Sequence, residues 1–466
     1  MSELIVYSPH NREPIAQFHL QGSSEVENAL SRAHAIFENR ENWLPKYRRI
    51  EILEKVVQKM QEKRESLIQI ALSEGGKPYI DSAVEVDRAI MGIKIAIQVL
   101  SQRHGQEIPM NLTPASAERF AVTINEPIGP VLAISAFNHP LNLIVHQAVP
   151  AIAVGAPVVV KPSLSTPLSC VELANLFHEA GLPKEWFQVV ICENDIAEKM
   201  VQDERVRFFS FIGSAKVGYY LRKLLPPGTG CALEHGGAAP VILTEETDWH
   251  RAIPPLVKGG FYHAGQVCVS VQRIFVPQSF VNEFAESLAA AASKLVVGNP
   301  KLKETEVGPL IHPREVKRVA QWVEEAVAAG ATLLTGGKEL IHTYYAPTVL
   351  LNPPLDAKVS KEEIFGPVVC VYSYTKLEDA IAQANSLPFN FQAAVFCDNL
   401  DKAFSIAVQL KGTGVMINDH TAFRTDWMPF GGKQLSGMGY GGIPYTMQDY
   451  THQKLLVIKS AAFKYN

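Results

Sequence analysis

Residues 130–167 read PVLAISAFNHPLNLIVHQAVPAIAVGAPVVVKPSLSTP, in which two short apolar runs enclose a helical segment. The runs at 131–134 and 157–160 have the length and the apolar character of buried strands. An Asn-His-Pro corner begins the helix between them, and Thr166 can cap the helix that follows. A strand, a helix and a second strand in this order predict a parallel sheet that is covered on both faces.

The same alternation continues through the rest of the chain. Further apolar strands are expected at 187–191 and 208–212, and a second set of strands and helices runs from 240 to 418. We therefore expect an α/β fold with two α/β domains. Ahead of the first sheet, apolar stripes predict three helices, which begin near Ser24, Lys46 and Asp81. Ser24 can cap the first of them.

Two segments have the pattern of strands that lie outside the main sheets. Residues 105–129 hold three prolines and an alternating apolar stretch at 120–124, which together predict a hairpin. The tail is apolar at 454–458, and a terminal strand of this kind is an exposed edge unless another strand pairs with it. The tail therefore predicts that the chain binds a second subunit.

The composition is that of a globular protein. The chain has 466 residues, of which 47% are hydrophobic and 19% are charged, and its formal net charge is -4. No basic run or face stands out, so neither nucleic acid nor an anionic membrane is an expected partner. The N-terminus lacks a basic segment followed by an apolar one, and no apolar run approaches the ~18–20 residues that span a bilayer.

The cysteines give a further constraint on chemistry and compartment. The chain has six, and they are scattered, with no C-x-x-C pair and no His/Cys cluster. This pattern argues against a disulfide framework and against structural zinc, so we expect no metal site and a reducing compartment, the cytoplasm. Most of these cysteines are expected to be buried and inert.

Three polar residues stand at positions where α/β enzymes carry out chemistry. Cys268 lies on a connection between a helical segment and a strand, where it is either exposed at the end of the sheet or buried as a small hydrophobe. Glu234 precedes a Gly-Gly pair and fits either a general base or a surface turn. Asn138 follows a strand, and its amide is either an oxyanion donor or a helix cap.

A possible phosphate site lies at 211–218, where a strand runs into a helix through Gly213 and Ser214, with Gly218 following. Free amides at the start of a helix suit a pyrophosphate. The stretch is not a G-x-G-x-x-G motif, so taken alone it is a weak signal.

Two other stretches have the character of a dinucleotide site. Lys161 and Ser163 come at the carboxyl end of a predicted strand, the usual place for a cofactor ribose. Glu363 and Phe365 stand close together, as a ribose hydroxyl acceptor and a ring beside a nicotinamide would. A surface charge next to a core aromatic explains the second pair equally well.

Seven motifs, taken in order, resemble the aldehyde dehydrogenase superfamily over almost the whole chain. A chance match of seven motifs in the family's order is very improbable. The matching stretches are 136–140 (AFNHP), 161–163 (KPS), 211–214 (FIGS), 234–237 (EHGG), 265–268 (GQVC), 362–367 (EEIFGP) and 429–432 (PFGG).

The resemblance implies a Rossmann-like cofactor domain, an α/β catalytic domain and a three-residue catalytic set. Cys268 is then the nucleophile that attacks the aldehyde, first giving a thiohemiacetal and then a thioester. Asn138 and the Cys268 backbone amide would hold the oxyanion. Glu234 would activate the water that hydrolyses the thioester, so we expect an apolar setting to raise its pKa.

The resemblance also assigns the cofactor residues. Lys161 and Ser163 would bind the adenosine ribose of NAD or NADP, and Glu363 and Phe365 the nicotinamide ribose and ring. The pyrophosphate would meet amides of the 213–218 segment, which includes Gly213, Ser214 and Gly218.

Leu164 is a departure that bears on which cofactor is used. Relatives that prefer NAD often carry a glutamate three residues after the lysine, and a carboxylate there would repel a 2′-phosphate. Leucine removes that repulsion, while Lys161 and Ser163 remain to meet a phosphate. We therefore predict that NADP is accepted and is preferred over NAD.

The substrate pocket is less clearly defined by the sequence. Arg424 could bind the carboxylate of a semialdehyde, or it could be structural and paired with Asp426, which is the interpretation we favour from sequence. By family position, the pocket candidates are His139, Leu143, His146, Val267, Phe423 and Arg424.

The resemblance also predicts the domain boundaries and the assembly. We expect a homodimer or a homotetramer that acts on a small-molecule aldehyde. The cofactor domain would comprise 1–108 and 128–235, the catalytic domain 236–435, and the oligomerisation elements 109–127 and 450–466.

Three alternatives remain at this stage. A CoA-acylating semialdehyde dehydrogenase of the same fold often lacks the base glutamate, so Glu234 argues against it. A cysteine hydrolase would need a histidine near Cys268, for which His263 is a candidate, but it would have no use for the cofactor motifs. A catalytically inactive binding protein would not be expected to keep the whole catalytic set.

Overall fold

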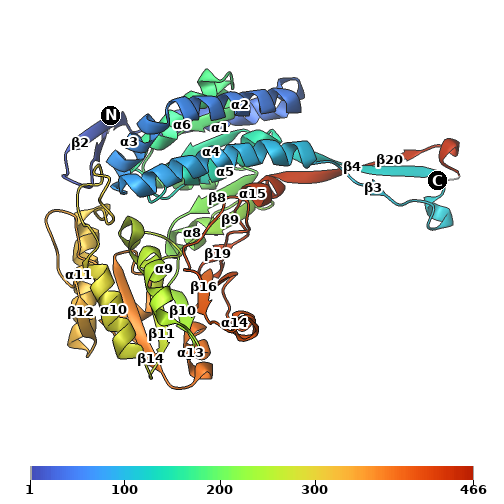
Figure 1. Cartoon of the computed structure of the whole chain (residues 1–466). Coiled ribbons are helices and arrows are strands. Elements are labelled where there is room, and N and C mark those ends of the chain that lie inside the picture. Colours follow the sequence, from blue (N-terminus) through green and yellow to red (C-terminus); the bar gives the residue numbers. More distant parts are fainter. Residues whose placement is uncertain (1–2, 465–466) are drawn as a thin grey trace.

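Two mostly parallel β-sheets form the body of the protein, and a long antiparallel arm projects from it (Figure 1). The computed structural model describes residues 3–464. Residues 1–2 and 465–466, which belong to the expected segments 1–108 and 450–466, lie outside the described residues.

The first sheet has six strands in the order β19-β9-β8-β5-β6-β7, and only β19 is antiparallel to its neighbour. The strand order reverses between β5 and β8, and such a switch point leaves a crevice at the carboxyl ends of the strands. The strands are β5 (Val131–Ile134), β6 (Val158–Lys161), β7 (Phe187–Val189), β8 (Phe208–Ile212), β9 (Gly230–Glu234) and β19 (Gly437–Met438).

Alternate side chains of these strands fill two separate cores, as expected for a sheet covered on both faces. Val131 and Ala133 face one helical layer, whereas Leu132 and Ile134 face the other. The first layer contains α2 (Lys46–Glu62), α3 (Arg64–Gly75), α4 (Tyr79–Gln102), α5 (Asn142–Val154) and α6 (Leu168–Glu179). The second layer contains α1 (Ser23–Glu38), α7 (Asn194–Val201) and α8 (Ala215–Arg222).

The early helices differ in detail from the sequence prediction. The second begins at Lys46 as predicted, and the one expected near Asp81 is α4, which begins at Tyr79. The prediction that Ser24 caps the first helix is wrong, because Gly22 is the N-cap residue and its amide donates to the Glu25 carboxylate at 2.9 Å.

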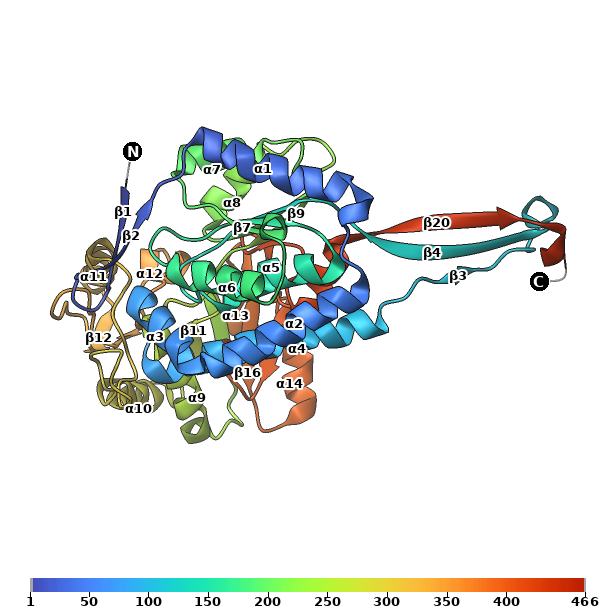
Figure 2. The same ribbon diagram turned by 90° about the horizontal axis from the view of Figure 1, so that it is seen from above.

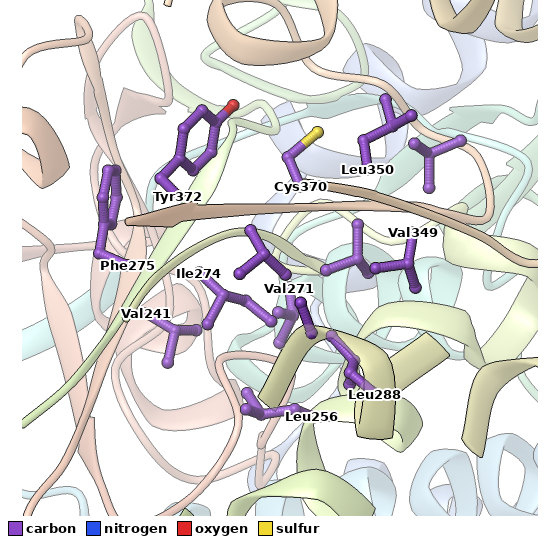
Figure 3. Close-up of a cluster of buried hydrophobic side chains, with 14 of the residues drawn as sticks. Val241, Leu256, Val271, Ile274, Phe275, Leu288, Val349, Leu350, Cys370 and Tyr372 are labelled. Carbon is purple, nitrogen blue, oxygen red and sulfur yellow. The ribbon is translucent and has the colours of Figure 1, made fainter. Parts of the chain in front are cut away.

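The second sheet has seven strands in the order β12-β13-β14-β11-β10-β16-β17. Leu256 and Leu288, from two helices, pack beneath strand residues such as Val241 and Ile274 (Figure 3). The strands are β10 (Ala239–Leu243), β11 (Val271–Pro277), β12 (Thr332–Thr335), β13 (Thr348–Leu351), β14 (Val368–Tyr374), β16 (Gln392–Phe396) and β17 (Gly414–Ile417). The helices are α9 (Trp249–Phe261), α10 (Val281–Ser293), α11 (Pro313–Ala328), α12 (Lys358–Lys361), α13 (Leu377–Ala384) and α14 (Leu400–Ala407).

The chain crosses between the two sheets twice. It first passes from β9 to β10 through residues 235–238, and it later returns, so that β19 pairs with β9 and α15 (Ile443–Asp449) packs on α5. Glu234 ends β9, so it stands where the two halves of the molecule meet.

The arm consists of β3 (Glu107–Ile108), β4 (Arg119–Pro127) and β20 (Thr451–Lys459), in the order β20-β4-β3. The hairpin predicted within 105–129 forms only in part, because β4 pairs with β3 at two positions and with the C-terminal β20 at nine. The arm extends well away from the body (Figure 2). The long C-terminal strand offers β4 more backbone hydrogen bonds than the local partner does.

Two small two-stranded sheets lie outside the main sheets and the arm. A two-stranded sheet pairs β1 (Glu3–Tyr7) with β2 (Pro14–His19), and β15 (Phe389–Asn390) pairs with β18 (Lys433–Gln434).

Within residues 3–464, no helix combines the length and the apolar character needed to cross a bilayer.

Candidate active site

One large cavity, of about 1230 Å³, runs from the carboxyl edge of the first sheet to the junction with the second. Nine of the ten residues predicted for the site line it, although they come from segments far apart in sequence. They are Asn138, Lys161, Ser163, Gly213, Ser214, Glu234, Cys268, Glu363 and Phe365.

Cys268 sits on a loop with an unusual backbone. His263, Ala264 and Gly265 have positive φ angles of 48°, 53° and 69°. The buried Gln266 side chain fixes this loop, since its amide donates to the carbonyls of His263 and Pro309, each at 3.2 Å. The Oε1 of Gln266 also accepts a hydrogen bond from the backbone N–H of Ile311, at 2.9 Å.

The Cys268 thiol is half-buried and lines the cavity, whereas four of the other five cysteines are fully buried. Burial raises the pKa of Cys268 well above its usual range, and the charges of Glu234 and Glu363 raise it further. The positive charge of Arg424 acts in the opposite direction. The thiol is therefore neutral at rest, and attack by sulfur requires a nearby group to take its proton.

Asn138 follows β5 and is held next to the cysteine loop. Its Nδ2 donates to the Gln266 carbonyl at 2.9 Å, which uses one of the two amide hydrogens. The other remains for a group in the cavity that Asn138 lines.

Glu234 carries a carboxylate without a strong partner. Its Oε1 is buried and accepts no hydrogen bond among the described residues, and the nearest cation, Nη1 of Arg424, is 3.9 Å away. Burial raises the pKa of Glu234, and the charges of Arg424 and Arg88 only partly offset this. The expected rise in pKa is thus confirmed, and it brings the carboxylate toward the range of a useful base.

Glu363 reaches into the same region from the second sheet. Its Oε1 accepts from the Gly237 backbone N–H at 3.2 Å, and burial raises the pKa of Glu363 to about 8. A Cβ at Gly236 would overlap this carboxylate, so the Gly-Gly pair after Glu234 is required by close approach. Phe365 packs edge-on against Phe137, with ring centroids 5.7 Å apart.

The other end of the cavity has the features of a dinucleotide site. Lys161 ends β6, its ammonium makes no hydrogen bond or ion pair to another described side chain, and burial lowers its pKa. Gly213 and Ser214 lead directly into α8, so the unpaired amides of that helix face the cavity they line. An unpartnered buried cation beside free amides fits the phosphates and ribose of NAD(P).

Gly218 differs from the other predicted cofactor residues, because it does not line the cavity. A Cβ there would overlap the ring of His235, whose Nδ1 is 2.9 Å from the Gly213 carbonyl. Glycine at 218 lets α8 approach His235, the residue that follows β9, and the contact of Gly218 with the cofactor stays a prediction.

The predicted substrate pocket is confirmed in part. Of the six candidates, His139, Leu143, Val267 and Arg424 line the main cavity, whereas His146 lines a small adjoining one. Phe423 lines neither of these cavities and is 44% exposed.

The interpretation that Arg424 pairs with Asp426 is wrong. Asp426 instead accepts two hydrogen bonds from Arg88, at 2.7 and 3.2 Å, and one each from His146 at 2.8 Å and Asn142 at 3.2 Å. Arg88 also lines the cavity, although it was not among the residues predicted for the site. It lies on α4, 338 residues from Asp426, so no local pattern could have revealed it.

A crevice at the strand-order reversal of a parallel sheet, continuous with a buried polar pocket, is typical of an NAD(P)-dependent oxidoreductase. Comparison with known proteins gives the family. Residues 2–456 match the model of the aldehyde dehydrogenase family, and the chain belongs to that family.

Individual relatives are similar over almost their whole length. The chain is 35% identical to a 3-sulfolactaldehyde dehydrogenase from Priestia aryabhattai, covering 97% of this chain and 94% of that protein. It is 35% identical to the glyceraldehyde-3-phosphate dehydrogenase GapN from Methanocaldococcus jannaschii complexed with NADP. That comparison has a TM-score of 0.93 and covers 98% of this chain and 99% of GapN. It is 28% identical to betaine aldehyde dehydrogenase from Staphylococcus aureus in complex with NAD+. That comparison has a TM-score of 0.94 and covers 99% of this chain and 92% of the other.

The chain is therefore an NAD(P)-dependent enzyme that oxidises an aldehyde to a carboxylic acid, as the sequence resemblance implied. The CoA-acylating and inactive alternatives are not favoured. The mixed α/β fold with parallel sheets is confirmed.

Proposed function

We propose that Cys268, Glu234 and Asn138 carry out this oxidation, with Cys268 as a covalent nucleophile. The observation that carries the proposal is their convergence on one cavity from three separate segments, the loop after β5, the end of β9 and the loop before β11. Asn138 is tied to the cysteine loop through Gln266, so the oxyanion donor and the nucleophile keep a fixed relation.

The reaction then follows from the properties of these groups. Cys268 loses its proton to a base and its sulfur bonds to the aldehyde carbon, which places negative charge on the carbonyl oxygen. Asn138 and the Cys268 amide stabilise that charge. Bound NAD(P)+ supplies the acceptor for the hydride that leaves the carbon, and the enzyme is left as a thioester on Cys268.

Glu234 completes the turnover. Its carboxylate takes a proton from water, the resulting hydroxide adds to the thioester carbon, and the carbon–sulfur bond breaks to release the acid. A raised pKa makes the carboxylate a stronger base for this step than an exposed glutamate. The negative charge of Glu234 also raises the pKa of Cys268.

NADP is the proposed preferred cofactor. Lys161, Ser163 and Leu164 line one part of the cavity, and Lys216 adds a second cation to its lining. Glu198 also lines the cavity, and its carboxylate accepts a hydrogen bond from the Tyr220 hydroxyl at 3.0 Å. Two lysines and no carboxylate at 164 favour a 2′-phosphate. Among solved relatives, GapN is complexed with NADP and betaine aldehyde dehydrogenase with NAD+.

We also propose that the domain boundaries predicted from the sequence separate cofactor binding, catalysis and subunit association. Residues 1–108 and 128–235 would bind the cofactor and 236–435 would supply the catalytic loop, which agrees with the composition of the two sheets. Residues 109–127 and 450–466 would join subunits into a dimer or a tetramer. The support is the projecting arm, whose β20 is an edge strand with apolar side chains 40–53% exposed at 455–458.

The names of relatives leave the aldehyde open. 3-Sulfolactaldehyde and glyceraldehyde 3-phosphate are anions, whereas betaine aldehyde is a cation. The charge of the substrate therefore depends on the residues that line the pocket of this chain.

The test of the catalytic assignment is turnover of an aldehyde panel with NADP and with NAD, followed by absorbance of the reduced nicotinamide. Cys268→Ala is expected to abolish turnover. Asn138→Ala is expected to lower kcat by roughly 10²–10³-fold, as loss of an oxyanion donor does. Glu234→Gln is expected to allow one rapid burst of reduced cofactor and then to stall at the thioester.

The matched control is Cys231→Ala, which removes the other half-buried cysteine, one that does not line the cavity. It is expected to keep wild-type kcat. Turnover that survives in Cys268→Ala would overturn the proposal, and release of a thioester only on addition of coenzyme A would favour the acylating mechanism.

A further inference from the structure

Arg424 is a buried cation in the pocket whose hydrogen-bonding groups are largely unused. Its side chain is 10% exposed, and its Nε is buried without a hydrogen-bond partner among the described residues. Its Nη2 donates only to Nδ1 of His146, at 3.4 Å. The guanidinium stacks on Phe430, with Cζ 3.6 Å from the ring centroid. A guanidinium has five N–H donors, and buried donors normally find acceptors.

Asp426, the acidic residue nearest to Arg424 in sequence, already pairs with other side chains. Asp426 accepts hydrogen bonds from Arg88, His146 and Asn142, so its negative charge balances that of Arg88. Burial lowers the pKa of His146 to about 4, so this ring is neutral: it donates from Nε2 to Asp426 and accepts at Nδ1. The charge of Arg424 is left without a counterion from this cluster.

None of the carboxylates that line the cavity accepts a hydrogen bond from Arg424 either. Glu198 accepts from Tyr220, Glu315 from Arg318 and Glu363 from Gly237. Glu234 is the nearest, but at 3.9 Å from Nη1 it is too far for a hydrogen bond. Arg424 and Glu234 thus form only a loose ion pair, and the Nε and Nη1 hydrogens of Arg424 have no hydrogen-bond acceptor among the described residues.

We propose that Arg424 binds an oxyanion at the far end of the substrate, and that the enzyme acts on short aldehydes that carry a carboxylate or a sulfonate. This inference rests on the proposed function, because it places the aldehyde carbon at Cys268. The planar fork of a guanidinium matches two oxygens of such a group. Arg88 lines the same cavity and donates to Asp426 only through Nε and Nη2, so its Nη1 is a further hydrogen-bond donor for such a group.

The first experiment measures charge selection at Cys268 without any turnover. Two methanethiosulfonates differ in charge, the 2-sulfonatoethyl reagent being an anion and the 2-hydroxyethyl reagent neutral. Each forms a mixed disulfide with the cysteine and releases methanesulfinate. The rate constants at the Cys268 peptide are measured by mass spectrometry, and their ratio, anionic over neutral, isolates the effect of charge.

In Arg424→Gln this ratio is expected to fall about tenfold or more, the size of a lost charge-assisted hydrogen bond. Arg424→Lys keeps the charge and is expected to give an intermediate ratio. Arg251→Gln removes an exposed arginine of α9 and is expected to match the wild type. An equal ratio in the wild type and Arg424→Gln would overturn the inference.

The second experiment uses turnover of 4-oxobutanoate and of butanal, which differ in the terminal carboxylate. The ratio of their kcat/KM values is expected to fall about tenfold or more in Arg424→Gln, mainly through a higher KM for 4-oxobutanoate. Any effect of Arg424 on Glu234 or Cys268 acts on both aldehydes and cancels in the ratio. A ratio that does not change would contradict the inference.

Failure of the proposed function and failure of this inference give different experimental results. If no reagent labels Cys268 and no aldehyde is oxidised, the proposed function is overturned and the inference falls with it. If Cys268 reacts and aldehydes are oxidised without preference for the anionic member of each pair, only the inference is overturned. Thermal unfolding of each variant, compared with Arg424→Lys, separates loss of fold from loss of selection.

Discussion

At the scale of single residues, the site is built from polar groups that lack their usual partners. The Glu234 carboxylate has a free buried oxygen, the Lys161 ammonium has no described partner, and the Arg424 guanidinium has one weak hydrogen bond. Each is costly to bury in this state. Such groups cluster in functional sites because substrate or cofactor supplies the missing partner.

The raised pKa of Glu234 predicts a pH dependence with a defined sign. Burial favours the protonated carboxyl, so thioester hydrolysis is expected to be lost as the pH falls through the raised pKa and to be complete above it. Arg424 favours the charged form, and its removal in Arg424→Gln is expected to raise the pKa of Glu234 further. The acidic limb of kcat, measured with a neutral aldehyde such as butanal, should therefore move to higher pH. An acidic limb at the same pH in both proteins would contradict this account.

Leu164 predicts cofactor preference at the level of one side chain. Leu164→Glu places a carboxylate where a 2′-phosphate would lie, so the kcat/KM ratio of NADP to NAD is expected to fall roughly tenfold. Leu164→Gln has a similar shape and no charge, and it is the matched control that should keep the ratio. Preference for NAD in the wild type would show that other residues, such as Glu198, dominate the choice.

At the scale of elements, the cofactor end depends on how closely α8 approaches β9. Gly218 makes this approach possible, because a side chain there would overlap the His235 ring. The first turn of α8 carries the free amides next to Gly213, so its position decides how they meet a phosphate.

Gly218→Ala is therefore expected to raise the dissociation constant for NADP several-fold, since overpacking at this contact costs about 1–3 kcal/mol and displaces α8. Binding is measured by titration calorimetry with NADP. The double variant with His235→Ala makes room for the methyl group and should recover part of the affinity. Gly298→Ala, which meets only Thr305 at 3.7 Å, is the neutral control. Affinity unchanged in Gly218→Ala would show that α8 tolerates the displacement.

At the scale of the whole molecule, the arm has little reason to be so long in a single chain. It carries an edge strand with exposed apolar side chains far from the body (Figures 1 and 2). Exposed strand edges of this kind promote association, and a second subunit would cover this one.

The wild type is accordingly expected to sediment as a dimer or a larger assembly at micromolar concentration. Leu456→Glu with Ile458→Glu places charge on β20 and should shift the protein toward monomer, measured by analytical ultracentrifugation. Leu400→Glu changes a 58% exposed side chain on α14 and is expected to leave the assembly intact. A wild type that is monomeric at these concentrations would contradict the role assigned to the arm.

From the sequence alone we could predict the parallel α/β architecture, most strand positions and the three residues that we propose for catalysis. These features are recorded locally: β5, β6 and β8 are short apolar runs, and Cys268, Glu234 and Asn138 stand at the ends of elements within recognisable motifs. Periodicity and end signals depend on neighbours in the chain, so a sequence reveals them.

Which polar groups have hydrogen-bond partners depends on the folded structure and could not be predicted from the sequence. Arg88, 338 residues from Asp426, forms the ion pair with Asp426 that Arg424 does not form. β4 pairs mainly with β20 and only briefly with β3, and a Cβ at Gly218 would overlap His235. Hydrogen-bond partners and close approaches depend on distances in space, which local patterns do not encode. The charge of the substrate pocket therefore emerges only once the chain is folded.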